Sequence, residues 1–130
     1  MIVDASAILA VLFDEPEGET IGDILTEQKG HLAISPFDYL EAAVRVDRFE
    51  SPRRSAEFDN MVALLGIEIV KTTDQQAFLA REAYQRFGKG NHPARLNLGD
   101  CFAYALAKAR AEPLLFKGDD FRQTDVEAVL

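Results

Sequence analysis

Short apolar runs alternate with longer helical segments along this chain. The runs are Ile2–Val3, His31–Ser35, Ile67–Lys71 and Pro113–Phe116, and Val126–Leu130 is a candidate for an added edge strand. Strands that alternate with helices predict a parallel sheet with helices on both of its faces. We therefore predict an α/β fold of three layers, with a mostly parallel central sheet of four to five strands. Residues 1–130 are predicted to form one domain.

The helical segments between these runs are delimited by capping signals. Serine followed by proline, at Ser35-Pro36 and again at Ser51-Pro52, is typical of an N-cap before the first helical position. Gly66 is typical of a helix end. The predicted helices are Ser6–Phe13, Pro16–Gln28, Pro36 to about Phe49, Pro52 to about Leu65, Thr73 to about Phe87, and Leu98–Ala111.

The composition limits the classes of protein to which this chain can belong. A single cysteine, Cys101, excludes an internal disulfide and a cysteine-based zinc cluster, as expected for a reducing compartment. The first strand has no basic leader before it, and no apolar run is long enough to span a bilayer. We therefore expect a cytoplasmic protein with no membrane partner.

The charge is negative overall and unevenly distributed. A net charge of −8, from 22 acidic and 14 basic residues, argues against non-specific nucleic-acid binding. However, Tyr84–Asn97 contains Arg86, Lys89 and Arg95 and no acidic residue. A basic segment beside a carboxylate cluster could bind a polyanion through a bridging metal, and a solvated loop is the alternative. The sequence leaves both interpretations open.

Acidic residues stand where an α/β fold brings distant parts of the chain together. Asp4 closes the first strand, Glu41 lies on a helix, Asp100 opens another helix, and the Asp119-Asp120 pair follows a late strand. In an open parallel sheet, ligands bind in the crevice outside the carboxyl ends of the strands. Carboxylates that converge there repel one another unless a hard cation lies between them, and their oxygens suit Mg²⁺ or Mn²⁺. The pattern therefore predicts a divalent metal site.

Most of these acids also have an ordinary structural interpretation. Asp4 could cap the helix that follows it. Asn97-x-x-Asp100 resembles a capping box, and an acid in a first helical turn is favoured by the helix dipole. Asp119 and Asp120 could belong to a polar turn. No competing His, Cys or Ser machinery accompanies the acids, so the group favours a metal site more strongly than any single member does.

Glu41 is informative because of its position on its helix. Phe37, Leu40 and Val44 are spaced as an apolar stripe that we expect to be buried, with Glu41 at its edge. A carboxylate beside a buried face needs a partner, a metal or access to water. The alternative to a metal is an ion pair with an arginine of the same helix.

Several stretches of this chain resemble one known family. They are Met-Ile-Val-Asp-Ala-Ser-Ala-Ile-Leu-Ala, the mid-chain helical Glu, Asn-Leu-Gly-Asp-Cys-Phe-Ala-Tyr-Ala-Leu-Ala, and Leu-Leu-Phe-Lys-Gly-Asp-Asp-Phe. In this order they resemble PIN-domain proteins of the VapC toxin type, and the resemblance covers the whole chain. The segment from Arg86 to Asn97 also resembles the loop of one VapC subgroup. The resemblance implies a PIN fold and a Mg²⁺-dependent endoribonuclease, with Mn²⁺ able to substitute, that acts as the toxin of a type II toxin–antitoxin system.

The resemblance also assigns roles to individual residues. Asp4, Glu41 and Asp100 match the family's metal-binding acids. Ser6 matches a small hydroxyl residue two positions after the first acid, whose implied role is a hydrogen bond to a metal-bound carboxylate or water. Contacts with RNA phosphates are expected from the basic residues Arg86, Lys89 and Arg95.

The fourth acid departs from the family pattern. Relatives often carry Asp-x-Asp-Phe at the end of this strand, whereas here Gly118 stands at the first acidic position. Asp120 immediately precedes Phe121 and therefore matches the second acid of the motif. Asp119 occupies the intervening position and is a candidate by proximity.

The implied reaction is hydrolysis of a phosphodiester in structured RNA (a tRNA, rRNA or mRNA) by metal-activated water. Asp4 and Asp100 hold the principal ion, while Glu41 and Asp120 order its waters, accept a proton or help to hold a second ion. Attack by water leaves a 5′-phosphate and a 3′-hydroxyl. The implied partners are a VapB-type antitoxin and a second copy of the chain in a homodimer.

Other classes of protein fit the residues less well. A receiver domain needs a phosphoacceptor Asp after the middle strand, where this chain has Thr72-Thr73. A haloacid-dehalogenase-type phosphatase needs Asp-x-Asp after the first strand, where Ser6 takes the place of the second acid. The remaining alternative is a catalytically inactive PIN-like module that binds a partner protein.

Overall fold

The computed structural model describes all of residues 1–130, and its centre is a four-stranded parallel sheet in the order β3-β2-β1-β4. The strands are β1 (Ile2–Val3), β2 (Leu32–Ile34), β3 (Ile67–Ile69) and β4 (Leu114–Leu115). Ile2 of β1 pairs with Ala33 on one side and with Leu114 on the other. The predicted α/β class and parallel sheet are confirmed, although each of the last three strands is shorter than the apolar run that predicted it.

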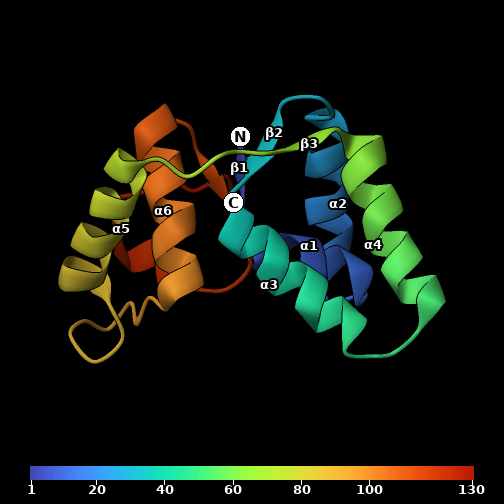
Figure 1. Ribbon diagram of the computed structural model, residues 1–130, viewed down its shortest axis with the longest axis horizontal. Coiled ribbons are helices and arrows are strands. Elements are labelled where there is room, and N and C mark those ends of the chain that lie inside the picture. The colour runs from blue at the N-terminus through green and yellow to red at the C-terminus, as the bar shows by residue number, and fades with distance from the viewer.

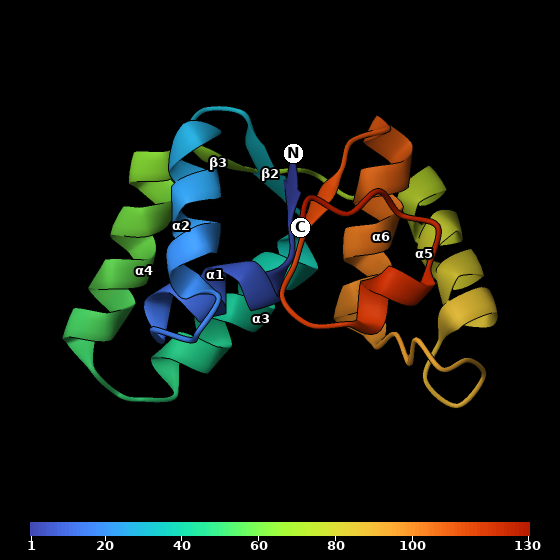
Figure 2. The same cartoon turned by 180° about the vertical axis from the view of Figure 1, so that it is seen from behind.

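Helices cover both faces of this sheet (Figures 1 and 2). α5 and α6 lie against one face, where they form one apolar core with residues such as Ile2 and Leu114. The first four helices lie against the other face and form a second core around Val3, Ile34 and Leu115. The helices are α1 (Ala5–Leu12), α2 (Gly18–Glu27), α3 (Pro36–Asp47), α4 (Pro52–Leu65), α5 (Asp74–Phe87) and α6 (Leu98–Arg110).

The predicted capping residues begin the helices as expected. Ser35, Ser51 and Thr73 are the N-caps of α3, α4 and α5, and each accepts a hydrogen bond from the backbone N–H three residues later. Gly66 ends α4 with a φ of 64°, a left-handed conformation that glycine adopts without strain. Local chemistry therefore sets these helix boundaries.

One predicted helix start and one predicted strand are wrong. The second helix begins at Gly18 rather than Pro16, because the N–H of Gly18 first closes a turn onto the carbonyl of Glu15 at 2.8 Å. Val126–Leu130 is not a strand and contributes one isolated bridge, between Leu114 and Ala128. β4 is only two residues long, so it offers too little edge for a ladder.

The predicted apolar stripe of α3 is also wrong. Phe37, Leu40 and Val44 are 42%, 60% and 38% exposed, so this face points away from the core. The buried face of α3 is instead made by Asp38, Ala42 and Val46. Periodicity identifies the faces of a helix, but packing against α1 and α6 decides which face is covered, and here the smaller side chains are inside.

The strand order predicts a ligand-binding crevice at the carboxyl end of β1. The chain adds β2 and then β3 on one side of β1 and finally returns to add β4 on the other side. In parallel sheets such a reversal opens a crevice outside the strand ends, where ligands bind. Asp4 directly follows β1, and Lys117–Asp120 follow β4. None of the helices combines the length and apolar character needed to cross a membrane.

Candidate active site

Asp4 lies at the centre of the strand-end crevice and also caps α1. Its Oδ2 accepts hydrogen bonds from the backbone N–H of Ser6 at 3.0 Å and from the Ser6 hydroxyl at 2.5 Å. The same hydroxyl accepts the N–H of Lys117 at 3.0 Å. Ser6 therefore joins the ends of β1 and β4 and fixes the orientation of the Asp4 carboxylate, while no hydrogen bond is formed to Asp4 Oδ1.

Asp100 is held by the capping box that the sequence predicted. Its Oδ2 accepts the N–H of Asn97 at 3.0 Å, and the Asn97 side-chain oxygen accepts the N–H of Asp100 at 2.9 Å. The box satisfies two backbone donors of the first turn of α6. Oδ1 of Asp100 takes no part in it. The capping and metal-binding interpretations of Asp4 and Asp100 are thus compatible, since each uses a different oxygen.

Glu41 faces the first turn of α6. Its Oε2 lies 2.3 Å from the point where a Cβ on Gly99 would stand, so a side chain at that position would displace the Glu41 carboxylate. Neither Arg45 nor Arg48 forms an ion pair with Glu41. The structure therefore lacks the ion pair that the sequence offered as the alternative to a metal at Glu41. Burial and then the charge of Asp4 raise the pKa of Glu41, with a smaller opposing effect from Arg45.

Asp38 is a fifth acid of the site that the sequence analysis missed. It is 0% exposed, and its Oδ2 accepts the Ser35 hydroxyl at 2.5 Å. Its Oδ1 has no hydrogen-bond partner and borders the same space beside Gly99 as Glu41 does. In the sequence Asp38 is an ordinary first-turn acid after a serine cap. Its spacing of three from Glu41, which places both on one helix face, was the available signal.

The late acids differ in where they lie. The side chain of Asp119 is 93% exposed, and its Oδ1 lies 3.6 Å from Arg122 Nε. Asp120 begins a 3₁₀ turn, Asp120–Gln123. Its charge contributes to the raised pKa of both Asp4 and Asp100. Gly118 has a φ of 98°, which an acid at the first motif position would not readily adopt. Asp120 is thus the late acid nearer the crevice, and its role stays a prediction.

The crevice acids raise one another's pKa. Burial is the main cause for Asp4, Asp38, Glu41 and Asp100, and repulsion between the carboxylates adds to it. Asp4 contributes to the shift of each of the other three, and the pKa of Asp100 rises from 3.8 to about 7. The ammonium of Lys117, which precedes Asp119 and Asp120 in the sequence, is paired with Glu15. None of these four carboxylates forms an ion pair with a basic side chain.

The donor set fits a hard divalent cation that keeps much of its water. The side chains offer only carboxylate oxygens, which suit Mg²⁺ or Mn²⁺. No three His, Cys, Asp or Glu side chains are grouped closely enough to enclose one ion together. Mg²⁺ is commonly held by one or two carboxylates with water completing its shell, so this spacing and the unpaired Asp38 Oδ1 are compatible with such an ion.

The basic segment Tyr84–Asn97 divides into two parts. Lys89 and Arg95 line a cavity of about 300 Å³ together with Asn97 and Asp120, and neither forms an ion pair. Arg86 instead lies 3.8 Å from Glu82 and from Asp125. Two of the three predicted RNA-contacting residues therefore lie next to the acidic crevice, and the third is engaged on the surface of α5.

Comparison with known proteins gives the family. The PIN-domain profile matches residues 1–127. The chain belongs to the PIN-domain family. Within this family its curated relatives are of the VapC type: it is 44% identical to a ribonuclease VapC of Mycolicibacterium smegmatis over 99% of both chains. It is also 42% identical to ribonuclease VapC30 of Mycobacterium tuberculosis, over 99% of this chain and 98% of that one.

Solved PIN-domain structures share the fold. Mycobacterium tuberculosis VapC20, described as a sarcin–ricin loop cleaving toxin, superposes with a TM-score of 0.78 at 14% identity, over 98% of this chain and 97% of that one. A toxin–antitoxin complex from Klebsiella pneumoniae gives a TM-score of 0.70 at 18% identity, over 95% and 92% of the two chains. At these identities the match bears on the fold alone. The receiver and phosphatase alternatives are excluded by the family assignment.

Proposed function

We propose that this chain is a Mg²⁺-dependent endoribonuclease and the toxin of a type II toxin–antitoxin system. The observation that carries the proposal is the convergence of Asp4, Glu41 and Asp100 at the strand-end crevice of a PIN domain whose curated relatives are VapC ribonucleases. A catalytically inactive interaction module would have no need of mutually repelling buried carboxylates, which lower stability unless they are used. RNA as substrate and the single buried thiol of Cys101 suit the cytoplasm.

The roles of the residues follow from their hydrogen bonds. Asp4 and Asp100 would hold the cation, because each has one oxygen fixed by backbone donors and one oxygen free. When bound, Mg²⁺ stabilises charge on the phosphate and lowers the pKa of a coordinated water. Glu41 would accept the proton of the attacking water, for which its raised pKa suits it. Asp120 would order water at the open side of the crevice.

The RNA backbone would enter beside the basic segment. Lys89 and Arg95 have no acidic partner and share a cavity with Asp120, so they are placed to neutralise phosphates next to the carboxylates. Tyr104 is 3% exposed and donates its hydroxyl to Asp125 at 2.7 Å, so it is packed in the core and does not stack a base. We propose structured RNA as the substrate, because single-stranded loops present phosphates and unstacked bases together.

A cleavage assay tests this function. Purified protein is incubated with a panel of tRNAs with Mg²⁺ or with EDTA, and the product ends are mapped. We expect Mg²⁺-dependent cleavage that leaves a 5′-phosphate. Asp100→Asn should lower the rate by at least about a hundredfold while the protein stays folded, because the amide keeps the cap acceptor but removes the charge. Cleavage by Asp100→Asn at the wild-type rate would exclude the assigned site.

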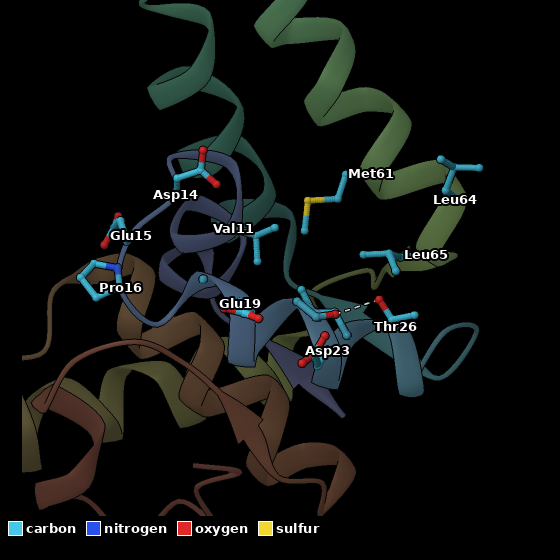
Figure 3. A pocket seen from close by; sticks show the side chains of 13 residues that line it. Val11, Asp14, Glu15, Pro16, Glu19, Asp23, Thr26, Met61, Leu64 and Leu65 are labelled. Atoms are coloured by element: carbon cyan, nitrogen blue, oxygen red, sulfur yellow. Dashed lines mark hydrogen bonds between the residues drawn. The ribbon is translucent and has the colours of Figure 1, made fainter.

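The antitoxin is proposed to bind in a groove between α1, α2 and α4. The groove has a volume of about 750 Å³, and its apolar lining residues include Val11, Leu25 and Met61. Figure 3 shows acidic side chains on the α1–α2 side and the apolar side chains of α4 opposite them. An apolar segment with basic residues at its edges complements this surface. The acids of the rim are Asp14, Glu15, Glu19 and Asp23.

A homodimer is proposed through the exposed face of α3. The side chains of Phe37, Leu40, Val44 and Leu98 border a groove of about 490 Å³ and remain uncovered in the single chain. Arg45 and Arg48 line the same groove as Glu41. A surface that carries both charges beside an apolar patch can pair with a second copy of itself about a two-fold axis.

The proposed interface predicts a specific failure of assembly. Leu40 is 60% exposed, so its replacement by glutamate should leave the fold intact and disrupt only the apolar contact between copies. Leu40→Glu should therefore sediment as a monomer at concentrations where the wild-type protein sediments as a dimer. A dimer of unchanged affinity in the variant would place the interface elsewhere.

A further inference from the structure

Only one of the two oxygens of the Asp38 carboxylate has a hydrogen-bond partner. Oδ2 accepts the Ser35 hydroxyl, whereas Oδ1 is the one buried side-chain oxygen or nitrogen of the chain that has no hydrogen-bond partner. Buried polar groups are almost always paired, because the loss of water without a replacement costs about 1–3 kcal/mol. An orphaned carboxylate oxygen in an otherwise satisfied protein therefore indicates an ion or a water as its partner.

Helix capping does not explain this oxygen. Ser35 caps α3 by accepting the N–H of Asp38 at 3.0 Å, which needs only the serine hydroxyl. In a complete capping box the acid would also accept the backbone N–H of Ser35, as Asp100 does with Asn97, and Asp38 makes no such bond. The cap thus leaves Oδ1 without a role.

The surroundings of Oδ1 direct it into the acidic crevice. A Cβ on Gly99 would lie 3.3 Å from Asp38 Oδ1 and 2.3 Å from Glu41 Oε2. Gly99 has no positive φ, so its backbone conformation does not require glycine. The first turn of α6 comes close to both carboxylates, and their oxygens border one small volume beside Asp100.

We propose that Asp38 is an additional carboxylate of the metal centre in this chain, and that its unpaired Oδ1 binds the divalent cation directly or through one of its waters. This inference rests on the proposed function, because it assigns a further oxygen to the cation that Asp4 and Asp100 are proposed to hold. Asp38 would approach from the buried side of the crevice, while Asp120 borders its open side. The cation would then satisfy the one fully buried side-chain oxygen that has no hydrogen-bond partner.

Metal binding without RNA tests the inference. Mn²⁺ is titrated into purified protein and the free ion is measured by electron paramagnetic resonance. Asp38→Asn keeps the shape and the contact with Ser35 but removes the charge. It should weaken Mn²⁺ binding by about 10- to 100-fold, the effect typical of groups that support a bound metal. The matched control is Asp59→Asn, an exposed acid of α4, which should bind Mn²⁺ as the wild type does.

Thermal melting separates this role from a structural one. Without metal, Asp38→Asn should melt a few degrees above the wild type, because it relieves repulsion in the crevice. Its melting temperature should then rise less than that of the wild type when Mn²⁺ is added. A metal-free variant that melts lower or fails to fold would identify the carboxylate as part of the α3 cap and overturn the inference.

Failure of the inference and failure of the function give different results. If Asp4→Asn abolishes Mn²⁺ binding but Asp38→Asn binds as tightly as the wild type, the metal centre stands and Asp38 lies outside it. If the wild-type protein binds no Mn²⁺ at all, the proposed function and the role of Asp38 fall together.

Discussion

At the scale of single residues, structural roles and proposed chemical roles fall on the same side chains. Asp4 caps α1 and Asp100 closes the capping box of α6, and in both cases Oδ2 alone makes the contacts. A backbone N–H that stabilises a carboxylate also fixes its direction. The fold thereby orients the second oxygen of each acid without additional residues. The Ser6 hydroxyl also accepts the N–H of Lys117, so it connects Asp4 to the end of β4.

The two late acids are predicted to differ in their effect on cleavage. Asp120→Asn should lower the cleavage rate at least tenfold, because the charge of Asp120 raises the pKa of both Asp4 and Asp100 and so lies close to them. The carboxylate of Asp119 is instead exposed to solvent near Arg122. Asp119→Asn is the matched control and should cleave at nearly the wild-type rate. Rates measured with one RNA at saturating Mg²⁺ make the comparison. A larger loss in Asp119→Asn would reverse the assignment of the fourth acid.

At the scale of elements, caps were easier to predict than faces. The signals at Ser35, Ser51 and Asn97 are local, so they marked the starts of α3, α4 and α6 correctly. The orientation of α3 depends on what packs against it. Phe37 and its apolar neighbours therefore suggested the wrong buried face, and Asp38 went unnoticed. Strand-end acids were predictable because parallel topology brings strand ends together, whereas the burial of one acid is a tertiary property.

The α1–α2–α4 groove gives a prediction at the same scale. A Cβ on Gly22 would touch only Val11, at 3.9 Å or more, so a larger side chain there enters the groove without disturbing the core. Gly22→Leu should weaken antitoxin binding at least tenfold and leave RNA cleavage intact. The leucine also favours the helix by up to about 1 kcal/mol relative to glycine, so lost binding would not reflect unfolding.

Thr20→Leu is the control for this groove. Thr20 is exposed on the same helix and does not line the groove, so it should bind antitoxin normally. Binding of the cognate antitoxin to both variants is measured by calorimetry. Equal affinities for Gly22→Leu and the wild type would exclude the groove as the binding site.

At the scale of the whole molecule, the chain concentrates negative charge in a fold that is already acidic. The net charge is −8, and four crevice acids have raised pKa values, with Asp100 at about 7. RNA carries the same sign of charge. In the proposed function, approach of an RNA substrate would therefore depend on a divalent cation in the crevice and on the unpaired charges of Lys89 and Arg95 beside it.

The raised pKa values predict how stability changes with pH. In the unfolded chain these acids titrate near pH 4, whereas in the folded protein Asp100 titrates at about 7. Between these values the folded state binds more protons, so the free energy of unfolding of the metal-free protein should fall as pH rises from 5 to 8. The expected loss is on the order of 1–3 kcal/mol. The pKa of Asp125 is lowered, so its contribution to stability changes only below pH 5 and does not offset the loss between pH 5 and pH 8.

Divalent metal should reverse this loss, because a cation binds the deprotonated carboxylates and so stabilises the folded state most at high pH. Urea unfolding at pH 5 and pH 8, with Mg²⁺ or with EDTA, measures both effects. Asp100→Asn should flatten the metal-free pH dependence, since it removes the group whose pKa is raised to about 7. If the metal-free wild type were as stable at pH 8 as at pH 5, the crevice acids would not have raised pKa values in the folded protein. The physical basis for a metal centre at this site would then be lost.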